Sequence, residues 1–421
     1  MTDPRPAPIG RRGPRATGLI GPVLALGVLG ILAVLTLGLL GGPVPALGVS
    51  RTKTNTGDVA NRTPDPVKVF VPVVPQEPAL RGSILFVKAG NLWTVTGTDV
   101  LTQLTTSGGA QYPSWSADGS TIYDVQLHTA AGSVPCSMIA ASGCGVQNVA
   151  YDLHYPVLTR LSATGGSPTA IRSGLYSWNG GRSTYFDGLW QPAISPNGKT
   201  IALITDAPDP LAHDYQLAFV PTAGGKINRP PLADDQGLGH NDPAWSPDGS
   251  EVAYTFNHRD GTLAAPRIAL YDIRSKSSRF LTKPGYAEPS FSPDGRWLVA
   301  INRTAKGDDV VILDASTGAE LLRVTSDGHS FEPVWSPAGD QVAFLRADGL
   351  SIDLWVDTLA GSGDTLSVTS DEPLTSQSAL DGTSKPSWFI AAGDMPTPST
   401  TPAASDPGTS ASPGTSASPG S

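Results

Sequence analysis

The chain has 421 residues, a length that suits two or three domains or one large repeat domain with tails. It contains 47 glycines and 39 prolines but only 15% charged residues, which favours many short strands and turns over long helices. The net charge of −9 leaves no basic surface for phosphates, so a nucleic-acid partner is excluded. The two cysteines are too few to build a tetrahedral zinc site.

The N-terminus reads as a membrane signal. Residues 1–17 form a short basic segment, and residues 18–41 are almost wholly apolar. A helix of this length spans about 34 Å, enough for a bilayer core of about 30 Å. Because arginine stays on the cytoplasmic side, we expect a single-pass transmembrane helix with a cytoplasmic N-terminus and an extracytoplasmic remainder.

A cleaved signal peptide is the competing interpretation of the same segment. The apolar run is longer than the roughly 7–15 residues usual in such peptides. Small residues at Val44–Ala46 nevertheless offer a cleavage site. The sequence therefore leaves a retained anchor and a processed one both open.

Two segments on either side of the central region are predicted to lie outside any folded core. Residues 42–80 are rich in proline, which fixes φ and removes a donor, so we expect an extended linker. Residues 392–421 repeat proline, serine, threonine and glycine and contain no aromatic residue. Such a segment buries too little apolar surface to fold, so we predict a disordered tail.

Between these segments, residues 81–391 contain six copies of one sequence repeat, which we call the unit. Its best copies are "DPAWSPDGSEVAYT" from Asp242 and "EPSFSPDGRWLVAI" from Glu288. Successive unit prolines are 79, 51, 46, 44 and 53 residues apart, close to the roughly 40–50 residues of a four-stranded propeller blade. The six prolines are Pro113, Pro192, Pro243, Pro289, Pro333 and Pro386.

Each unit predicts a hairpin followed by two further strands. Pro-x-aromatic-Ser reads as a short strand with proline at its first position, where no interior ladder bond is lost. Pro-Asp-Gly is turn chemistry, and the alternating apolar run after it is the return strand. Four strands per unit, stacked radially, protect most of the sheet edges.

The two ends of the repeat region complement each other. The stretch from Gly82 supplies three strands without a Pro-x-aromatic strand, and the stretch from Lys385 supplies only that strand. Pairing the two termini in one blade explains both halves. The predicted fold is therefore an all-β, six-bladed propeller closed by its N- and C-terminal strands and preceded by one transmembrane helix.

The repeat pattern resembles the TolB-like, WD40-like propeller repeats, which also occur in the N-terminal propellers of prolyl-oligopeptidase-type peptidases. The resemblance covers about residues 82–390 and implies the fold more strongly than the function, because this repeat serves many purposes. The peptidases also carry a hydrolase domain with a G-x-S-x-G serine motif, which this sequence lacks. A serine hydrolase is therefore not expected.

The propeller topology brings one set of residues together. The residue before each unit proline is expected at one mouth of the central channel, with two histidines nearby: Tyr112, Gln191, Asp242, Glu288, Glu332, Lys385, His240 and His329. The acids among them could attract a cation, a basic peptide end or calcium, the one candidate ion. In the alternative, each carboxylate accepts backbone N–H bonds and holds neighbouring blades together.

Two insertions offer further candidate surfaces. One concentrates aromatic residues among glycine and polar residues, as recognition surfaces do, or forms an aromatic cap over the core. Its residues are Tyr176, Trp178, Tyr185 and Trp190. The other insertion contains Cys136 and Cys144, which we predict to form a disulfide outside the cell, with free thiols as the alternative.

These observations favour a membrane-anchored, extracytoplasmic, non-catalytic module that binds or scaffolds an envelope protein or peptide, as the TolB resemblance implies. No cofactor is predicted. The alternative is a calcium-dependent hydrolase of the lactonase type, whose six-bladed propellers hold calcium in the channel. The acids at the channel mouth motivate that alternative.

Overall fold

A computed structural model of the chain describes residues 80–97, 100–136, 148–208, 210, 213–232, 239–257, 265–361 and 365–396. The chain divides into two compact units, residues 1–74 with 135–147 and residues 75–134 with 148–421, and the blades belong to the second unit. The predicted membrane segment at residues 18–41, the linker and most of the tail lie outside the described residues. In the described part of the chain, no helix is long and apolar enough to cross a membrane.

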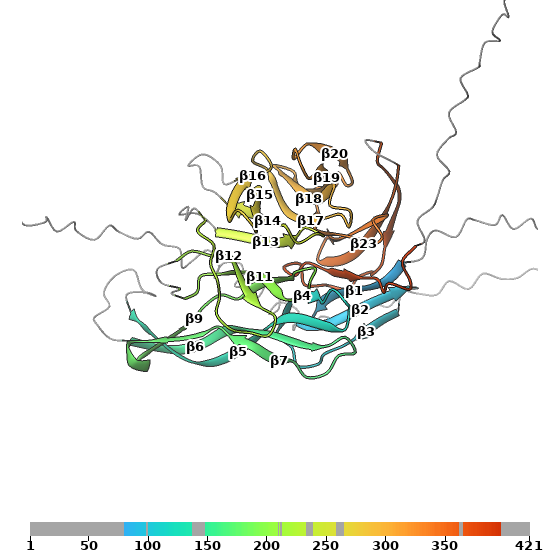
Figure 1. The fold of residues 1–421 in the computed structure, drawn as a ribbon. Helices are drawn as coiled ribbons and strands as arrows, with labels where there is room; N and C mark the ends of the chain where they lie inside the picture. Colours follow the sequence, from blue (N-terminus) through green and yellow to red (C-terminus); the bar gives the residue numbers. More distant parts are fainter. Residues whose placement is uncertain are drawn as a thin grey trace, which may run out of the picture. The chain divides into compact units, whose positions relative to one another are not determined.

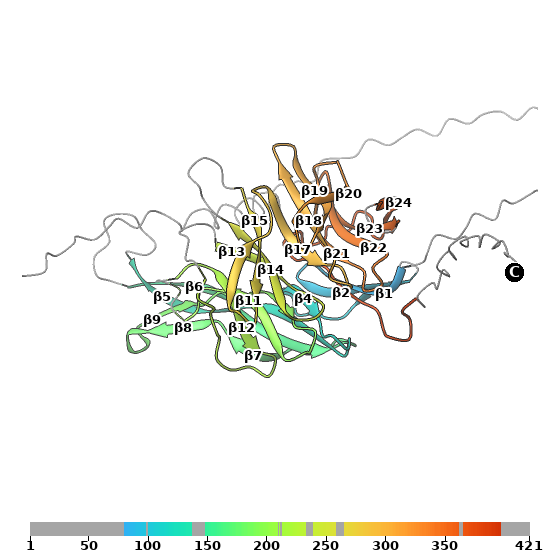
Figure 2. The same ribbon diagram turned by 45° about the horizontal axis from the view of Figure 1, so that its top comes forward.

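The described residues form six antiparallel blades, which follow one another along the chain as in Figures 1 and 2. Blade 1 has the strand order β25 (Ser387–Phe389), β1 (Leu80–Lys88), β2 (Asn91–Gly97) and β3 (Val100–Gln103). The closure predicted between the two ends of the repeat region is confirmed. The last strand, β25, pairs with β1 through Ser387 to Leu85, Trp388 to Ile84 and Phe389 to Ser83.

Blade 2 is larger than the others. Its core strands are β4 (Ala110–Trp115), β5 (Thr121–Pro135), β6 (Asn148–Ser162) and β7 (Thr169–Ser173). The outer half of β5 also pairs with a hairpin made of β8 (Leu175–Trp178), the 3₁₀ turn η2 (Asn179–Gly181) and β9 (Ser183–Phe186). This hairpin carries three of the four residues of the aromatic insertion, one of the two insertions between Pro113 and Pro192.

Blade 3 departs from the predicted four strands. It contains β10 (Trp190–Ile194), β11 (Thr200–Thr205) and β12 (Gln216–Pro221). Where the fourth strand was expected, the described residues show a single bridge between Phe219 and Asn228. The segment around Asn228 is followed by "RPPL", and its prolines cannot donate ladder bonds.

Blades 4, 5 and 6 each have the four strands predicted from the repeat. Blade 4 has β13 (Gly239–Trp245), β14 (Glu251–Asn257), β15 (Arg267–Asp272) and β16 (Ser277–Phe280). Blade 5 has β17 (Tyr286–Phe291), β18 (Trp297–Thr304), β19 (Gly307–Asp314) and β20 (Glu320–Arg323). Blade 6 has β21 (Ser330–Trp335), β22 (Gln341–Asp348), β23 (Ser351–Ala360) and β24 (Ser367–Pro373).

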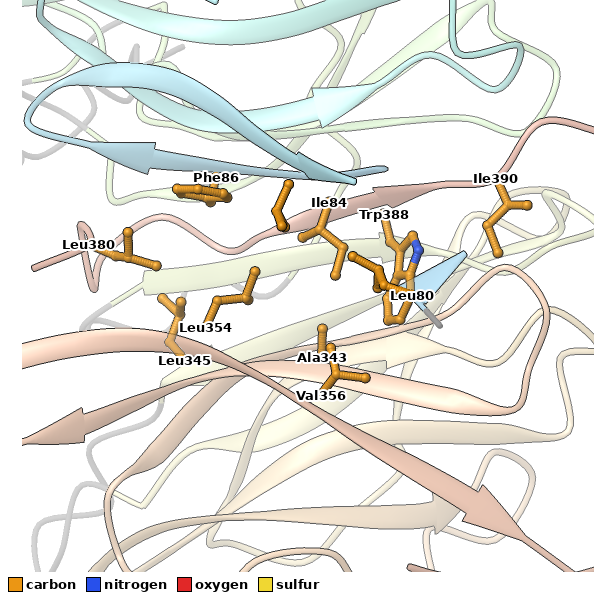
Figure 3. Packing of buried hydrophobic residues seen from close by; sticks show 11 residues of the cluster. Leu80, Ile84, Phe86, Ala343, Leu345, Leu354, Val356, Leu380, Trp388 and Ile390 are labelled. Atoms are coloured by element: carbon orange, nitrogen blue, oxygen red, sulfur yellow. The ribbon is translucent and has the colours of Figure 1, made fainter. Parts of the chain in front are cut away.

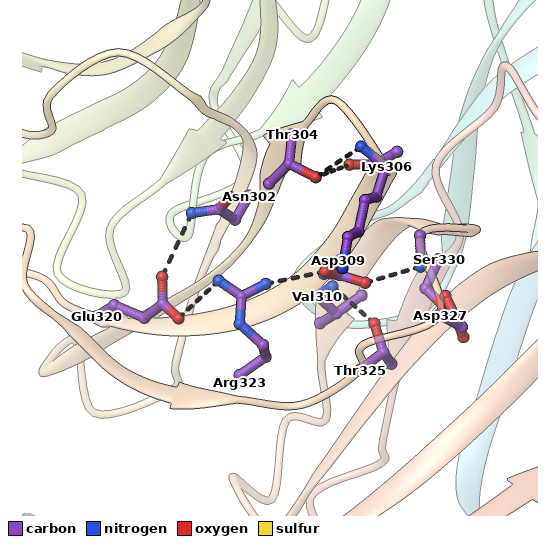
Figure 4. Close-up of polar contacts among 12 residues, drawn as sticks. Asn302, Thr304, Lys306, Asp309, Val310, Glu320, Arg323, Thr325, Asp327 and Ser330 are labelled. Atoms are coloured by element: carbon purple, nitrogen blue, oxygen red, sulfur yellow. Dashed lines mark hydrogen bonds and ion pairs between the residues drawn. The ribbon is translucent and has the colours of Figure 1, made fainter.

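Buried threonines fasten the outer part of four blades. In blade 5 the N–H of Val310 donates to Thr325 Oγ1 at 2.9 Å, while Arg323 bridges Asp309 and Glu320 (Figure 4). The same threonine bond recurs in blades 1, 4 and 6 through Thr105, Thr282 and Thr375. A backbone N–H that would otherwise be buried without a partner is thereby satisfied. This accounts for the threonine that ends these four units, preceded by leucine in blades 1, 4 and 6 and by valine in blade 5.

Hydrophobic clusters lie within and between the blades. At the closure, Ile84, Phe86 and Trp388 of blade 1 pack against Leu345 and Leu354 of blade 6 (Figure 3). Trp388 is 7% exposed, and its Nε1 donates to the carbonyl of Arg81 at 2.8 Å. The closing strand is therefore held by apolar burial as well as by its ladder bonds.

The position of the unit prolines corrects the sequence prediction. Proline is not the first residue of its strand, because the innermost strands of blades 2 to 6 begin two to four residues before it. In these five blades the proline and the residue before it form a β-bulge, and the residue before the proline has a φ between 50° and 57°. The bulge re-aims that residue and ends regular pairing there.

Candidate functional site

The six residues before the unit prolines are placed at equivalent positions of the six blades. We call this set the pre-proline ring: Tyr112, Gln191, Asp242, Glu288, Glu332 and Lys385. Four of them, Tyr112, Gln191, Asp242 and Lys385, line one cavity of about 330 Å³ that all six blades enclose. Residues far apart in the sequence therefore share one site, as the propeller prediction required.

Blades 3, 4 and 5 are joined through side chains of the ring. Gln191 donates from Nε2 to Asp242 Oδ1 at 2.6 Å and accepts the backbone N–H of Asp242 at 2.9 Å. Thr255 donates to Asp242 Oδ2 at 2.9 Å and accepts the N–H of Glu288 at 2.9 Å. The Gln191–Asp242 bonds cross from blade 3 to blade 4, and the Thr255–Glu288 bond crosses from blade 4 to blade 5, so these polar groups act as ties between blades.

The ties continue through blades 5, 6 and 1. Glu288 Oε2 accepts the backbone N–H of Glu332 at 2.6 Å, and Arg303 Nη2 lies 3.6 Å from Glu288 Oε1. Lys385 Nζ lies 3.8 Å from Glu332 Oε2 and donates to the carbonyl of Pro289 at 3.2 Å. The ammonium contributed by the closing blade therefore lies among the acids of its neighbours.

Blade 2 contacts its two neighbouring blades through different kinds of interaction of Tyr112. Toward blade 1, the N–H of Tyr112 donates to Ser384 Oγ at 3.2 Å. Toward blade 3, the ring contact is aromatic, with Tyr112 and Trp190 at 6.2 Å between centroids. Of the two interpretations of the acids, these bonds support ties between blades, since each of the three carboxylates is engaged with a neighbouring blade.

Burial changes the protonation of the ring. It raises the pKa of Glu288 to about 7, and the charge of Asp242 adds to the effect. Burial, followed by the charge of Glu288, raises the pKa of Glu332 well above its ordinary value. The phenol of Tyr112 likewise has a raised pKa because it is buried and faces Glu332. Near neutral pH the ring therefore carries less negative charge than three free carboxylates would.

The two histidines predicted near the ring occupy other environments. His240 is 3% exposed, accepts the N–H of Leu217 at Nδ1 at 3.2 Å, and packs 4.7 Å from the Tyr254 ring. Burial lowers its pKa to about 4, so it is neutral at physiological pH. His329 is exposed, and its N–H donates to Asp327 at 2.7 Å. Neither lines the cavity.

A second set of residues that line the channel has small, uncharged side chains. All six unit prolines are buried, whereas the residue after each of them is partly exposed. These six residues form what we call the lumen ring: Ser114, Ala193, Ala244, Ser290, Val334 and Ser387. Each of them lines the cavity. The lumen ring therefore offers hydroxyls and methyl groups, while Asp242 and Lys385 of the pre-proline ring line the same cavity.

The aromatic insertion is divided between two places. Trp190 belongs to β10 and contacts Tyr112 of the pre-proline ring. Tyr176 and Trp178 lie on β8 with their rings stacked at 5.5 Å, and Tyr185 lies opposite Tyr176 on β9. Trp190 fits the interpretation as an aromatic cap over the core, whereas the hairpin residues fit the interpretation as a recognition surface. The predicted disulfide stays a prediction, because Cys144 lies outside the described residues.

Sequence reasoning missed three residues that complete the ties: Thr255, Arg303 and Ser384. Thr255 had a signal, since the equivalent place in four other blades holds an aliphatic residue, Val125, Ile204, Ile301 or Leu345. Arg303 lies near the end of the equivalent strand, β18, and looks like an ordinary surface arginine in the sequence. Ser384 precedes a truncated unit and had no counterpart for comparison.

A metal centre has no visible basis in the described part of the chain. No group of three or more His, Cys, Asp or Glu side chains there is arranged to hold a metal ion. In particular, Asp242 accepts from the Gln191 amide and the Thr255 hydroxyl. Glu288 accepts one backbone N–H and lies near Arg303, and Glu332 lies near Lys385. Calcium at the channel mouth is thus an expectation from the sequence alone.

Comparison with known proteins places the fold. No protein-family model matches the chain. It is similar to the putative TolB of Agrobacterium tumefaciens, with a TM-score of 0.50 and 20% identity over 75% of this chain and 96% of that one. TolB of Acinetobacter baumannii gives a TM-score of 0.50 and 19% identity over 73% of this chain and 66% of that one.

The chain is a TolB-like six-bladed β-propeller.

Curated relatives of the TolB-like propeller match only in part. The Protein TolB homolog of Chlorobium chlorochromatii is 34% identical over 107 residues, 25% of this chain and 23% of that protein. The Uncharacterized peptidase YuxL of Bacillus subtilis is 29% identical over 170 residues, 32% of this chain and 24% of that protein. The TolB-like propeller thus spans about a quarter of each of these two relatives.

Proposed function

We propose that this chain is a non-catalytic, membrane-anchored propeller outside the cytoplasm that binds a protein or peptide of the cell envelope at its channel. Residues 18–41 would be the anchor, and the channel with the aromatic hairpin would be the binding face. The proposal depends on one observation, that the polar groups of the pre-proline ring contact neighbouring blades. These polar groups are engaged in ties between blades, and the lumen ring beside them has small, uncharged side chains, an arrangement suited to binding rather than to chemistry.

The TolB-like fold supports the same conclusion by analogy. Matches to proteins named as peptidases come from sequence segments that cover about a quarter of YuxL and 20% of Dipeptidyl-peptidase 5 of Porphyromonas gingivalis. Since the sequence lacks G-x-S-x-G, we infer that the segment shared with these two proteins is propeller and not hydrolase domain.

Photocrosslinking in cells tests the proposal. A photoreactive amino acid placed at Ser290 in the lumen ring of the full chain should give a discrete adduct with a polypeptide. The same amino acid at Ser367, an exposed residue of the outer strand β24, is the control. Equal adducts at both positions, or none at Ser290, would contradict a channel ligand.

The calcium-dependent hydrolase is the second candidate, motivated by the three acids of the ring. A calcium titration of the full chain separates it from the first. If the acids are ties, Asp242→Asn lowers the melting temperature, and no saturable calcium binding is seen in either protein. Tight calcium binding that Asp242→Asn abolishes would favour the hydrolase.

A further inference from the structure

Among the described residues, two with charged side chains line the channel cavity, and they differ in how far their polar atoms are engaged. Asp242 Oδ1 accepts Gln191 Nε2 at 2.6 Å, and Asp242 Oδ2 accepts the hydroxyl of Thr255 at 2.9 Å. The Lys385 ammonium has three N–H donors, and in the described part of the chain it makes one hydrogen bond, to the carbonyl of Pro289 at 3.2 Å. The aspartate is thus occupied by the protein itself, whereas the ammonium keeps donors for a molecule in the cavity.

The acids that balance Lys385 lie outside the cavity wall. Glu332 Oε2 is 3.8 Å from Lys385 Nζ, too far for a hydrogen bond, and neither Glu332 nor Glu288 lines the cavity. The Glu332 side chain is 9% exposed, and its Oε2 has no hydrogen-bond partner in the described part of the chain. The pair is therefore loose, and a molecule that enters the cavity meets the ammonium rather than these two acids.

Burial also weakens the negative charge behind the ammonium. It raises the pKa of Glu288 to about 7, with a further contribution from Asp242. Burial and then the charge of Glu288 raise the pKa of Glu332 well above its ordinary value. Near neutral pH the acid next to Lys385 is therefore largely protonated, and the ammonium lacks a full counter-charge.

An anion fits this position better than a cation does. A cation bound at Glu332 Oε2 would lie close to the Lys385 ammonium, and the two positive charges would repel each other. A carboxylate that accepts from the ammonium would instead make a charge-assisted hydrogen bond. The lumen ring lines the same cavity, and the hydroxyl groups of Ser114 and Ser290 suit the uncharged part of a peptide that carries the carboxylate.

We infer that the Lys385 ammonium is the binding site for a carboxylate of the polypeptide that occupies the channel. The carboxylate is the C-terminal group of the partner or the side chain of one of its acidic residues, and the neighbouring peptide residues would lie along the lumen ring. The inference rests on the proposed function and adds the charge that the partner presents. It replaces the expected attraction of a cation or a basic peptide end, because the protein engages Asp242 and Glu288 in its own hydrogen bonds.

Binding of a carboxylate at Lys385 should be linked to proton uptake. A bound negative charge raises the pKa of nearby glutamates further, so affinity should rise as pH falls through about 7, the pKa of Glu288, until the ligand itself protonates near about pH 4. An uncharged ligand should show no such rise. The titratable and charged groups that interact with Glu332 are Tyr112, Asp242, Glu288, Arg303 and Lys385.

Affinity selection on the full chain tests the inference. The probe is a pool of acetylated random hexapeptides with free C-terminal carboxylates. Each retained peptide is made again as its C-terminal amide and, where it contains Asp or Glu, with Asn or Gln in that place. One of these changes should weaken binding about tenfold or more at pH 7, and it identifies the source of the carboxylate. The affinity of the unmodified peptide should rise from pH 8 to pH 6.

Variants of Lys385 assign the effect to this site. Lys385→Met should weaken binding of the unmodified peptide about tenfold and leave that of the neutralised peptide unchanged. Lys385→Arg keeps the charge and should still discriminate between the two peptides, which decides the question if Lys385→Met does not fold. The matched control is Lys276→Met, an exposed lysine in the turn between β15 and β16, which should change neither binding nor thermal unfolding.

Three results would overturn the inference. Peptides that bind equally well after amidation and after side-chain replacement use no carboxylate, although their binding would still support the proposed function. Peptides rich in Lys or Arg that bind Lys385→Met more tightly than the wild type would show a cation site. If no peptide is retained, or if Lys385→Met binds the unmodified peptide as the wild type does, Lys385 is not the site, and photocrosslinking at Ser290 then decides the proposed function separately.

Discussion

At the scale of single residues, five positions before the unit prolines adopt a backbone conformation that their side chains disfavour. Tyr112, Gln191, Asp242, Glu288 and Glu332 all have positive φ, which costs each of them about 1–2 kcal/mol. The strain is offset because the bulge aims each residue at the next blade or at the channel. Glycine would relieve the backbone, but it could not supply the ties that Gln191, Asp242 and Glu288 make.

A pair of aspartates in blade 6 predicts a pH dependence. Asp357 is 1% exposed and lies directly opposite Asp371 in the β23–β24 ladder. Burial, then the charge of Asp371, raises the pKa of Asp357 to about 8, while Arg346 acts in the other direction. The folded state thus holds a proton that the unfolded state releases near pH 4, so stability should fall as pH rises from about 4 to 8.

Replacing the outer aspartate checks this account. Asp371→Asn removes the facing charge, so the free energy of unfolding at pH 8 should rise by about 1 kcal/mol, and its decline with pH should become shallower. Urea unfolding at pH 5 and pH 8 measures both effects. Asp348→Asn, an exposed aspartate of the same blade, is the control. An unchanged pH slope in Asp371→Asn would show that the pair is not the source.

One turn lacks a proline that the equivalent turns have. Pro196, Pro247 and Pro293 each lie beside the turn glycine of the next blade, at 3.1–3.8 Å from where a Cβ would be in Gly249, Gly295 and Gly339. Blade 2 has Ala117 at this place, and no heavy atom of the described chain lies within 4 Å of the corresponding position in Gly198.

The substitution Ala117→Pro should therefore stabilise the protein. In this turn the N–H of Gly119 donates to the carbonyl of Ser116, and the N–H of Ser116 donates to the carbonyl of Thr121, as in the equivalent turns. A proline at position 117 is therefore accommodated without strain. Fewer unfolded conformations and a new contact with Gly198 should add about 0.5–1 kcal/mol. Thermal unfolding measures the change, with Ala130→Pro, within the regular strand β5, as a destabilising comparison. A lower melting temperature for Ala117→Pro would mean that this turn differs from the rest.

At the scale of elements, the closing strand β25 is short but well anchored. Three residue pairs join it to β1, and Trp388 fills the cluster shared with blade 6 (Figure 3). Phe389 also packs against the turn of blade 2 and Trp115, with centroids 5.8 Å apart. The strand therefore contacts the blades on both of its sides.

A tryptophan comparison measures this anchoring. Trp388→Ala should lower the free energy of unfolding by about 3–5 kcal/mol, because a buried side chain and its hydrogen bond to Arg81 are lost. Trp178→Ala, on the half-exposed hairpin, should cost less than about 1 kcal/mol. Chemical denaturation of the two variants side by side decides the matter. Similar losses in both would mean that β25 is not a main support of the fold.

The elements also mark where sequence patterns suffice and where they do not. The strand pairs of blades 4, 5 and 6 could be predicted, since "SPDG" fixes a turn and apolar alternation fixes the return strand. Blade 3 could not, because prolines around Asn228 replace the fourth strand while the spacing of the units stays normal. The hairpin β8–β9 was visible only as an aromatic-rich insertion, since four-residue strands are too short to show a period of two.

At the scale of the whole propeller, neighbouring blades are joined by the pre-proline ring at five interfaces through polar contacts and at one through an aromatic contact. The exception lies between blades 2 and 3, where the turn proline is also replaced by Ala117. The sequence predicted which residues would share this ring, because the repeat fixes their positions. It could not predict their partners, since the bulges and Thr255, Arg303 and Ser384 depend on the packed structure.

Closure of the toroid gives the last prediction. A chain that ends after Ser384 loses Lys385, the three ladder pairs of β25 and the side chain of Trp388 together. The acids of blades 5 and 6 would then lack an ammonium, and blade 1 would lack its innermost strand. We expect the melting temperature to fall by about 10 °C and unfolding followed by fluorescence and by circular dichroism no longer to coincide.

A chain that ends after Pro396 is the matched control, because it keeps β25 and removes only residues predicted from the sequence to contribute no core. It should unfold like the full chain. If the chain ending at Ser384 also does so, the ring is held by contacts between neighbouring blades alone. In that case the pairing of β25 with β1 would position the channel residues without stabilising them, and the ties of the pre-proline ring would have to account for the cooperativity.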